Sequence, residues 1–152
     1  MAVLTTDILL RGIKRDQVFD WLGDPENHRR ILEGAFEGMK VVGPGQFELT
    51  FTAPVKKRTL GYRFSGLDDS HAGRRANVVT TGKRMEGELH YSLRTMKPSS
   101  NTLVTLHMDV PTGGIDAVIF DNFVRKPLEA SFVKILDNLS RIIPRTSVPA
   151  DE

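Results

Sequence analysis

Hydrophobic positions near the C-terminal end of the chain recur every three or four residues between Ile115 and Ile143. This spacing places them along one side of an α-helix, whereas polar residues such as Glu129 and Lys134 take the other side. A helix of roughly 25 residues would span about 38 Å, enough to cross a small domain. Pro127 lacks an N–H and its ring clashes with the preceding turn, so we predict either a kink there or a new helix start. The apolar stripe comprises Phe120, Phe123, Val124, Leu128, Phe132, Ile135, Leu136, Leu139, Ile142 and Ile143.

Upstream of this helix, the hydrophobic period changes to two, which is typical of strands with one buried face. The clearest case is Gln46–Ala53, in which Phe47, Leu49 and Phe51 alternate with polar residues. Turn residues such as Gly43-Pro44-Gly45 separate the segments. The predicted strands are Val3–Arg11, Phe36–Val42, Gln46–Ala53, Arg58–Leu67, Arg74–Thr81, Glu86–Met96 and Thr102–Val110.

Two short helices are predicted after the first strand. The first covers Asp16–Leu22. The second begins at Asp24-Pro25, with Asp24 as the cap and Pro25 in the first helical position, and runs to about Glu33. Short turns between strands imply an antiparallel sheet, so the predicted class is α+β, with a curved seven-stranded sheet wrapped round one long C-terminal helix. We expect bends or bulges at glycines 61, 66 and 87.

Composition narrows the classes of function. With 152 residues, one domain is expected, which we place at residues 1–146, followed by a disordered tail at 147–152. The chain has no cysteine, which fits a reducing compartment, and we find no signal peptide or membrane span. We therefore expect a cytoplasmic protein. Its net charge of +2 is spread along the chain, so nucleic acid is not expected as a partner.

The order of elements resembles the START-like helix-grip fold, also called the SRPBCC or polyketide cyclase-dehydratase superfamily. Val18–Asn27 is similar to the family's early helix followed by Asp-Pro, and Phe132–Leu139 is similar to its closing helix. Pro127 departs from an unbroken closing helix. The resemblance implies a deep, mostly apolar cavity between sheet and helix, used for lipids, sterols, polyketides or similar molecules. Some members are enzymes, some are carriers and some bind proteins, so the fold does not select one activity.

Pairing the strands by their turns predicts which residues face the helix. A hairpin centred on Pro98 and Ser99 sets Leu89 opposite Met108, Tyr91 opposite Leu106 and Leu93 opposite Val104. A hairpin centred on Arg84 sets Leu89 opposite Val79 and Tyr91 opposite Asn77. A slip of one residue would reverse every face. The inward residues that we predict to bind a ligand are Tyr62, Phe64, Arg75, Asn77, Leu89, Tyr91, Leu106, Met108, Phe123 and Phe132.

Tyr62, Asn77 and Tyr91 would form a small polar group in an apolar wall, which suits a ligand pocket. The alternative is that the tyrosine hydroxyls reach solvent or backbone and that Asn77 lies at a bulge. Arg75 would either meet an anionic head group or extend to water.

Other polar residues indicate a functional site less clearly. The same pairing sets His90 opposite His107 on the outer face, but two histidines do not make a zinc site, and we predict neither a metal nor a cofactor. His28 and His71 have no evident catalytic partners, and no hydrolase, metalloprotease or phosphate-loop motif occurs. Lys56-Lys57-Arg58 is a basic cluster that is either a solvated loop or a contact for anionic lipid or an acidic partner.

Three functions remain open. The first is a noncatalytic binder of a small apolar molecule, with Pro111–Ile115 and the two short helices as gates. The second is a cyclase or dehydratase-like enzyme, which needs an inward acid or base that the predicted site lacks. The third is a protein-interaction module resembling chaperone activators. The expected partners are a small apolar molecule and transiently a membrane surface, for a protein that is a monomer or homodimer.

Overall fold

The described part of the chain forms seven strands, two short helices and one long helical segment. The computed structural model describes residues 2–52, 56–70, 73–82, 86–97, 100–110 and 118–145. The tail expected at 147–152, the turn at Pro98 and Ser99 and the gate Pro111–Ile115 lie outside these residues. In chain order the elements are β1 (Ala2–Leu10), α1 (Arg15–Leu22), α2 (Pro25–Leu32), β2 (Gly38–Gly43), β3 (Gln46–Thr52), β4 (Lys57–Ser70), β5 (Gly73–Thr81), β6 (Gly87–Met96), β7 (Asn101–Val110), the π-helical turn η1 (Phe120–Val124) and α4 (Arg125–Ile142).

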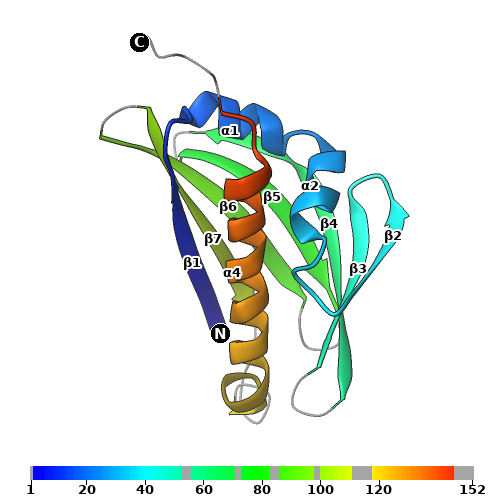
Figure 1. Ribbon diagram of the computed structural model, residues 1–152. Helices are drawn as coiled ribbons and strands as arrows, with labels where there is room; N and C mark the ends of the chain where they lie inside the picture. Colours follow the sequence, from blue (N-terminus) through cyan, green and yellow to red (C-terminus); the bar gives the residue numbers. More distant parts are fainter. Residues whose placement is uncertain are drawn as a thin grey trace.

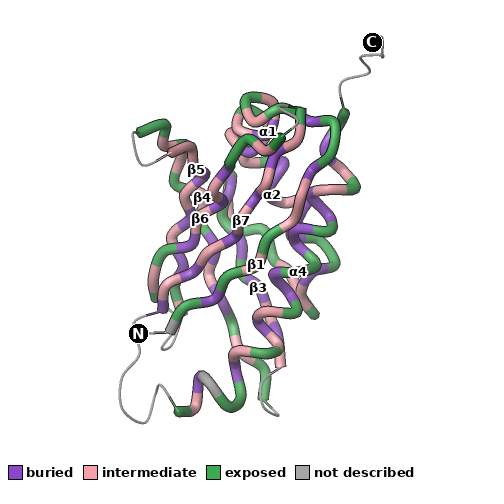
Figure 2. Tube along the Cα trace, turned by 90° about the vertical axis from the view of Figure 1, so that its left-hand side faces the viewer, coloured by how far each residue is buried: buried purple, intermediate pink, exposed green. Residues whose placement is uncertain are grey.

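The strands make one antiparallel sheet in the order β1-β7-β6-β5-β4-β3-β2. Figure 1 shows the sheet curving round α4, with α1 and α2 at the upper end of that helix. In the view turned by 90°, the sheet and α4 form two layers, and buried positions alternate along the strands (Figure 2). The predicted α+β helix-grip architecture is therefore confirmed.

The core lies between the concave face of the sheet and α4. Buried side chains come from alternate positions of β1 and of β3 to β7, because successive residues point to opposite faces. On α4 they recur at helical spacing, including Leu128, Phe132, Ile135 and Leu139. Each of these apolar side chains contributes about 1.5–3 kcal/mol when removed from water.

Pro127 lies in the first turn of α4, directly after η1. The helical segment already includes η1, and α4 starts two residues before the proline. In η1 the N–H of Arg125 bonds to the carbonyl of Phe120, five residues back. In a regular α-helix the proline ring would clash with the carbonyl four residues back, and one backbone hydrogen bond would be missing. A π-helical turn changes the spacing of these groups, so the helix accommodates the proline more easily.

Two of the predicted hairpin registers can be compared with the sheet. Between β6 and β7 the expected pairs are present: Leu89 with Met108 and Tyr91 with Leu106. Between β5 and β6 the expected register is wrong by one residue, since Tyr91 pairs with Ala76 and Asn77 pairs with His90. The valines and threonines at 78–81 come in adjacent pairs, so alternation along β5 does not distinguish the two registers.

Candidate functional site: a buried tyrosine–tyrosine–histidine chain

The second short helix places a histidine inside the core. Asp24 caps α2 by accepting the N–H of Glu26 (3.0 Å), and Pro25 occupies the first turn, as predicted. The four-residue spacing then directs His28 to the same side of the helix as Leu32. His28 is completely buried beneath the sheet-facing side of α2.

Three side chains from separate elements form a continuous hydrogen-bonded chain. His28 Nδ1 lies 2.6 Å from the hydroxyl of Tyr62 on β4. That hydroxyl lies 2.7 Å from the hydroxyl of Tyr91 on β6. At the other end, His28 Nε2 lies 2.7 Å from the backbone carbonyl of Leu22, at the end of α1. These hydrogen bonds thus link both short helices to the middle of the sheet.

The chemistry of the partners fixes the direction of each hydrogen bond. A carbonyl oxygen only accepts, so Nε2 of His28 must carry a proton and donate it to Leu22. In a neutral imidazole Nδ1 is then an acceptor, and Tyr62 donates to it. Tyr91 in turn donates to the Tyr62 oxygen. The Tyr91 oxygen therefore retains its capacity to accept a hydrogen bond, at the end of the chain.

Burial keeps all three groups neutral near pH 7. It lowers the pKa of His28 from 6.5 to about 4, against smaller opposing effects of the Leu22 carbonyl and the Asp24 carboxylate. Burial also raises the pKa of Tyr62 well above its usual range, with the neighbouring Tyr91 adding to the shift. It raises the pKa of Tyr91 as well. The three hydrogen-bonded side chains are consequently neutral dipoles, and none of them forms an ion pair with another.

Aromatic and aliphatic side chains surround this chain. The ring of Phe64 stacks on His28, with centroids 4.4 Å apart and planes 27° apart. Phe47 lies beside Tyr62, with ring centroids 6.0 Å apart. Leu89 and Phe132 are buried in the same core. A few polar groups in an apolar wall are typical of sites that orient small molecules.

Of the ten predicted ligand-binding residues, seven lie in the core or against it, and three do not. Those that are buried in the core are Tyr62, Leu89, Tyr91, Leu106, Met108 and Phe132, and Phe64 is partly buried against it. The predicted inward positions of Asn77 and Arg75 are wrong, because the one-residue shift between β5 and β6 turns both to the outer face. Arg75 there pairs with Asp68 at 3.2 Å. Phe123 is 47% exposed, since η1 directs Phe120 and Val124 inward instead.

His28 is a member of the site that is not among the predicted residues. Its spacing from Leu32 marked it as a residue on the buried side of α2. Its partner could not be inferred, because Tyr62 follows 34 residues later on a strand. The group predicted as Tyr62, Asn77 and Tyr91 therefore contains His28 in place of Asn77.

The outer face of the sheet carries the second polar cluster. His90 and His107 are opposite each other, as predicted, with ring centroids 5.0 Å apart. His107 also contacts the carboxylate of Asp109 through Nε2, at 3.0 Å. Burial, followed by the charges of His107 and Arg75, lowers the pKa of His90. Within the described parts of the chain, no group of three or more histidine, aspartate or glutamate side chains is arranged to hold a metal ion.

Comparisons with known proteins identify the fold. The sequence matches no family model and no curated protein at a significant level. Among solved structures, KanY protein (ms6282) is similar with a TM-score of 0.66 and 13% identity, covering 93% of this chain and 97% of that chain. A START superfamily protein from Mycobacterium smegmatis gives 0.54 and 12%, covering 93% and 96%. Zhui aromatase/cyclase from Streptomyces sp. R1128 gives 0.55 and 13%, covering 94% and 96%.

These similarities extend over nearly the whole chain. Together with the curved antiparallel sheet, the two short helices and the closing helix, they show that the chain has the START-like helix-grip fold. At 12–13% identity the likeness concerns the fold alone. None of the described helices is both long enough and apolar enough to cross a membrane.

Proposed function

We propose that the protein binds a small, largely apolar molecule between the inner face of the sheet and α4. The observation that carries this proposal is the buried chain that ends at Tyr91. Its hydroxyl donates to Tyr62, so its oxygen is an acceptor within an otherwise apolar wall. A ligand with a hydroxyl or amine group would donate to that oxygen, while its hydrocarbon part would contact the surrounding aliphatic and aromatic side chains.

Access for such a ligand requires the covering elements to separate from the sheet. Tyr91 is completely buried, and Tyr62 is nearly so. The short helices are suited to this movement, because each has eight residues and depends on packing for its stability. We therefore retain the pair α1 and α2 as the proposed gate.

Because the three hydrogen-bonded side chains are neutral, the site favours ligand binding over catalysis. An enzyme of the cyclase or dehydratase type, the alternative that the Zhui similarity raises, needs a group that exchanges protons near the working pH. His28, with its pKa lowered to about 4, is a poor base at neutral pH. Because their pKa values are raised, Tyr62 and Tyr91 are poor acids at neutral pH. Orientation of a ligand by a neutral hydroxyl needs neither property.

A matched pair of ligands tests the proposal directly. Binding of 1-naphthol and of naphthalene, which lacks the hydroxyl, is measured by isothermal titration calorimetry. We expect 1-naphthol to bind up to about tenfold more tightly, since one hydrogen bond contributes about 0.5–1.5 kcal/mol. Tyr91→Phe should remove this preference, whereas Ser92→Ala, on the opposite face of β6, should leave it unchanged. A folded protein that binds neither compound, nor any apolar compound of a wider panel, would contradict the proposal.

A further inference from the structure

One end of the molecule combines exposed apolar side chains with clustered cations. It is formed by the start of β4 and by the helical segment 118–126. Figure 1 places η1, the start of β4 and the start of β1 at this end. We propose that this end, the docking end, binds the surface of an anionic lipid bilayer. The inference does not depend on the proposed ligand.

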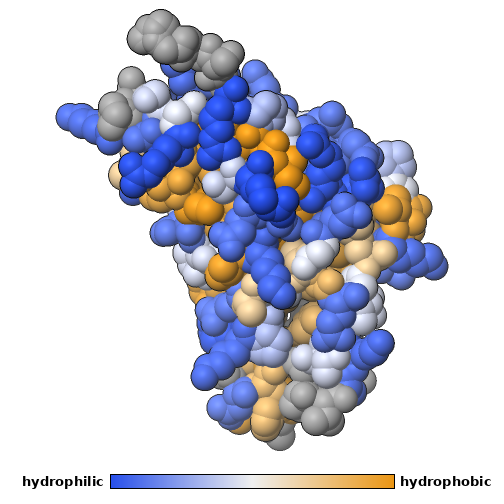
Figure 3. All heavy atoms as spheres, in the orientation of Figure 1, coloured by the Kyte–Doolittle hydropathy of each residue, from blue (hydrophilic) through white to orange (hydrophobic). Residues whose placement is uncertain are grey.

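The apolar part of the docking end lies on the helical segment. Val118 is 57% exposed and Phe123 is 47% exposed, whereas Phe120 and Val124, on the other side of the same segment, are buried. Single exposed apolar residues are common on protein surfaces. Two on one helical segment, next to the exposed Lys126, form the arrangement that lets a helix lie at a membrane interface. Figure 3 shows apolar and hydrophilic side chains next to one another at the lower end of this face.

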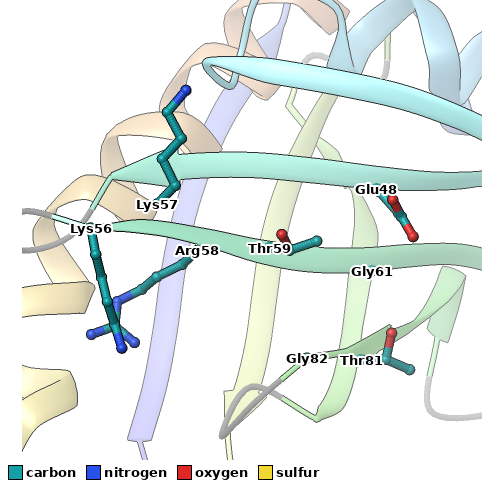
Figure 4. Close-up of a pocket in the computed structure, with 8 residues that line it drawn as sticks. All are labelled: Glu48, Lys56, Lys57, Arg58, Thr59, Gly61, Thr81 and Gly82. Atoms are coloured by element: carbon teal, nitrogen blue, oxygen red, sulfur yellow. The ribbon is translucent and has the colours of Figure 1, made fainter.

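The cationic part comes from the start of β4. Lys56 and Lys57 are exposed, and Arg58 is partly exposed. Figure 4 shows the side chains of Lys56 and Arg58 extending to the same side, where their ends approach each other, while Lys57 points the other way. They border an open hollow of about 300 Å³ that Thr81 and Gly82 also line. The exposed ammonium groups of Lys56 and Lys57 would attract the phosphate or carboxylate of a lipid head group.

Among the described residues, other charged groups also lie at this end, and two of them have defined contacts in the fold. Arg125 donates to the backbone carbonyl of Val3 at 2.7 Å and lies over the ring of Phe120, so it fixes the helix start to β1. The carboxylate of Glu37 accepts the backbone N–H of Thr52 at 2.8 Å and its hydroxyl at 2.9 Å. Glu48 lines the far side of the hollow, and Glu86 is exposed. Lys56, Lys57 and Lys126 thus supply the attraction to an anionic surface.

An anionic bilayer fits this combination better than other occupants. A nucleic acid would attract the lysines but offers nothing comparable to acyl chains for Val118 and Phe123. A second copy of the chain would bring two sets of cations together. A bilayer accepts the apolar side chains at the boundary of its acyl region and attracts the lysines with its head groups.

Vesicle co-sedimentation of the full chain tests the inference. We expect binding to phosphatidylcholine vesicles that contain one part in three of phosphatidylglycerol, and at least tenfold weaker binding to phosphatidylcholine alone. Each lysine near an anionic surface contributes about a fivefold factor. The double substitution Lys56→Gln/Lys57→Gln should therefore weaken binding about 25-fold, and Phe123→Ser should weaken it independently of the charge.

The solvent side of α4 offers matched controls. Val133 is 46% exposed, close to the value for Phe123, and Lys134 is exposed beside it. Val133→Ser and Lys134→Gln should leave vesicle binding unchanged. Equal binding to neutral and anionic vesicles, equal losses in the control variants, or self-association through the docking end without vesicle binding would each overturn the inference. Ligand titrations without vesicles report separately on the proposed function.

Discussion

The hydroxyl of Tyr62 lies 2.6 Å from Nδ1 of His28, so the middle of the sheet is hydrogen-bonded to the helix that covers it. Both side chains are buried, and each has a second hydrogen-bond partner. The packing of α2 on the sheet therefore depends on a polar contact as well as on apolar area. Because a buried polar group without a partner costs about 1–3 kcal/mol, this contact makes α2 sensitive to changes at either residue.

The stability of the protein should depend on pH through His28. Its pKa is about 4 in the folded protein and 6.5 when exposed, as it is in the unfolded chain. Between these values the unfolded chain binds a proton that the folded protein does not, so acidification favours unfolding. At about 1.4 kcal/mol per pH unit, the histidine should remove about 3 kcal/mol of stability as the pH falls from 6.5 to 4.

Urea unfolding, followed by the fluorescence of Trp21, the one tryptophan of the chain, provides the measurement. Carboxylates also titrate in this range, so the comparison is with His28→Gln, which lacks only the histidine. The variant should be less stable at pH 7 but should lose about 3 kcal/mol less between pH 6.5 and 4. Parallel pH profiles for the two proteins would show that His28 does not titrate as described.

The two tyrosines should differ in their effect on stability. Tyr62→Phe removes both the donor to His28 and the acceptor for Tyr91, so two buried groups lose their partner, and we expect a loss of about 2–3 kcal/mol. Tyr91→Phe removes one hydrogen bond but leaves Tyr62 bonded to His28, for a loss of about 1 kcal/mol.

The double variant provides the control for this pair. In the background of Tyr62→Phe, the further change Tyr91→Phe should cost almost nothing, because its hydroxyl is already unpaired. The two single effects should therefore not add in a double-mutant cycle measured by urea unfolding. Strict additivity would mean that the two hydroxyls do not interact.

Those parts of the fold that depend on strong periodicity were predictable from the sequence. The apolar stripe around Phe132 identified the closing helix, and Asp24-Pro25 identified the start of α2. The β6–β7 pairing followed from the turn predicted at Pro98 and Ser99, which sets Leu89 and Tyr91 opposite their observed partners.

The composition of the site was only partly predictable. Along β5, the pairs Val78-Val79 and Thr80-Thr81 present similar side chains to both faces, so the pattern does not determine the register or the face on which Asn77 lies. The contact of His28 with Tyr62 depends on how α2 packs over the sheet, which local sequence does not specify. A regular helix predicts an inward Phe123, whereas the π-turn before Pro127 leaves this side chain exposed.

A buried threonine connects the sheet to the segment before α1. The hydroxyl of Thr102, at the start of β7, donates to the carbonyl of Ile13 at 2.8 Å, and both side chains are fully buried. Thr102→Val keeps the shape but removes the donor, so we expect a loss of about 1–3 kcal/mol in urea unfolding. Thr105→Val, on the outer face of the same strand, should change stability by no more than about 0.5 kcal/mol.

The closing helix is joined to the end of α2 by one side-chain amide. Nδ2 of Asn138 donates to the carbonyls of Ile31 and Glu33, each at 3.0 Å. Carbonyls at a helix C-terminus have no partner within the helix, and here α4 supplies one from another element. Asn138 is buried, so water does not readily replace the amide.

Asn138→Ala should therefore lower the free energy of unfolding by about 1–3 kcal/mol. It should also accelerate amide hydrogen exchange in α2 more than in the central strands, because it loosens the attachment of that helix rather than the sheet. Asp137→Ala, at the exposed neighbouring position, removes a polar side chain of similar size and should change neither quantity appreciably. If exchange rose equally in β6 and β7, Asn138 would stabilise the whole domain and not the attachment of α2 in particular.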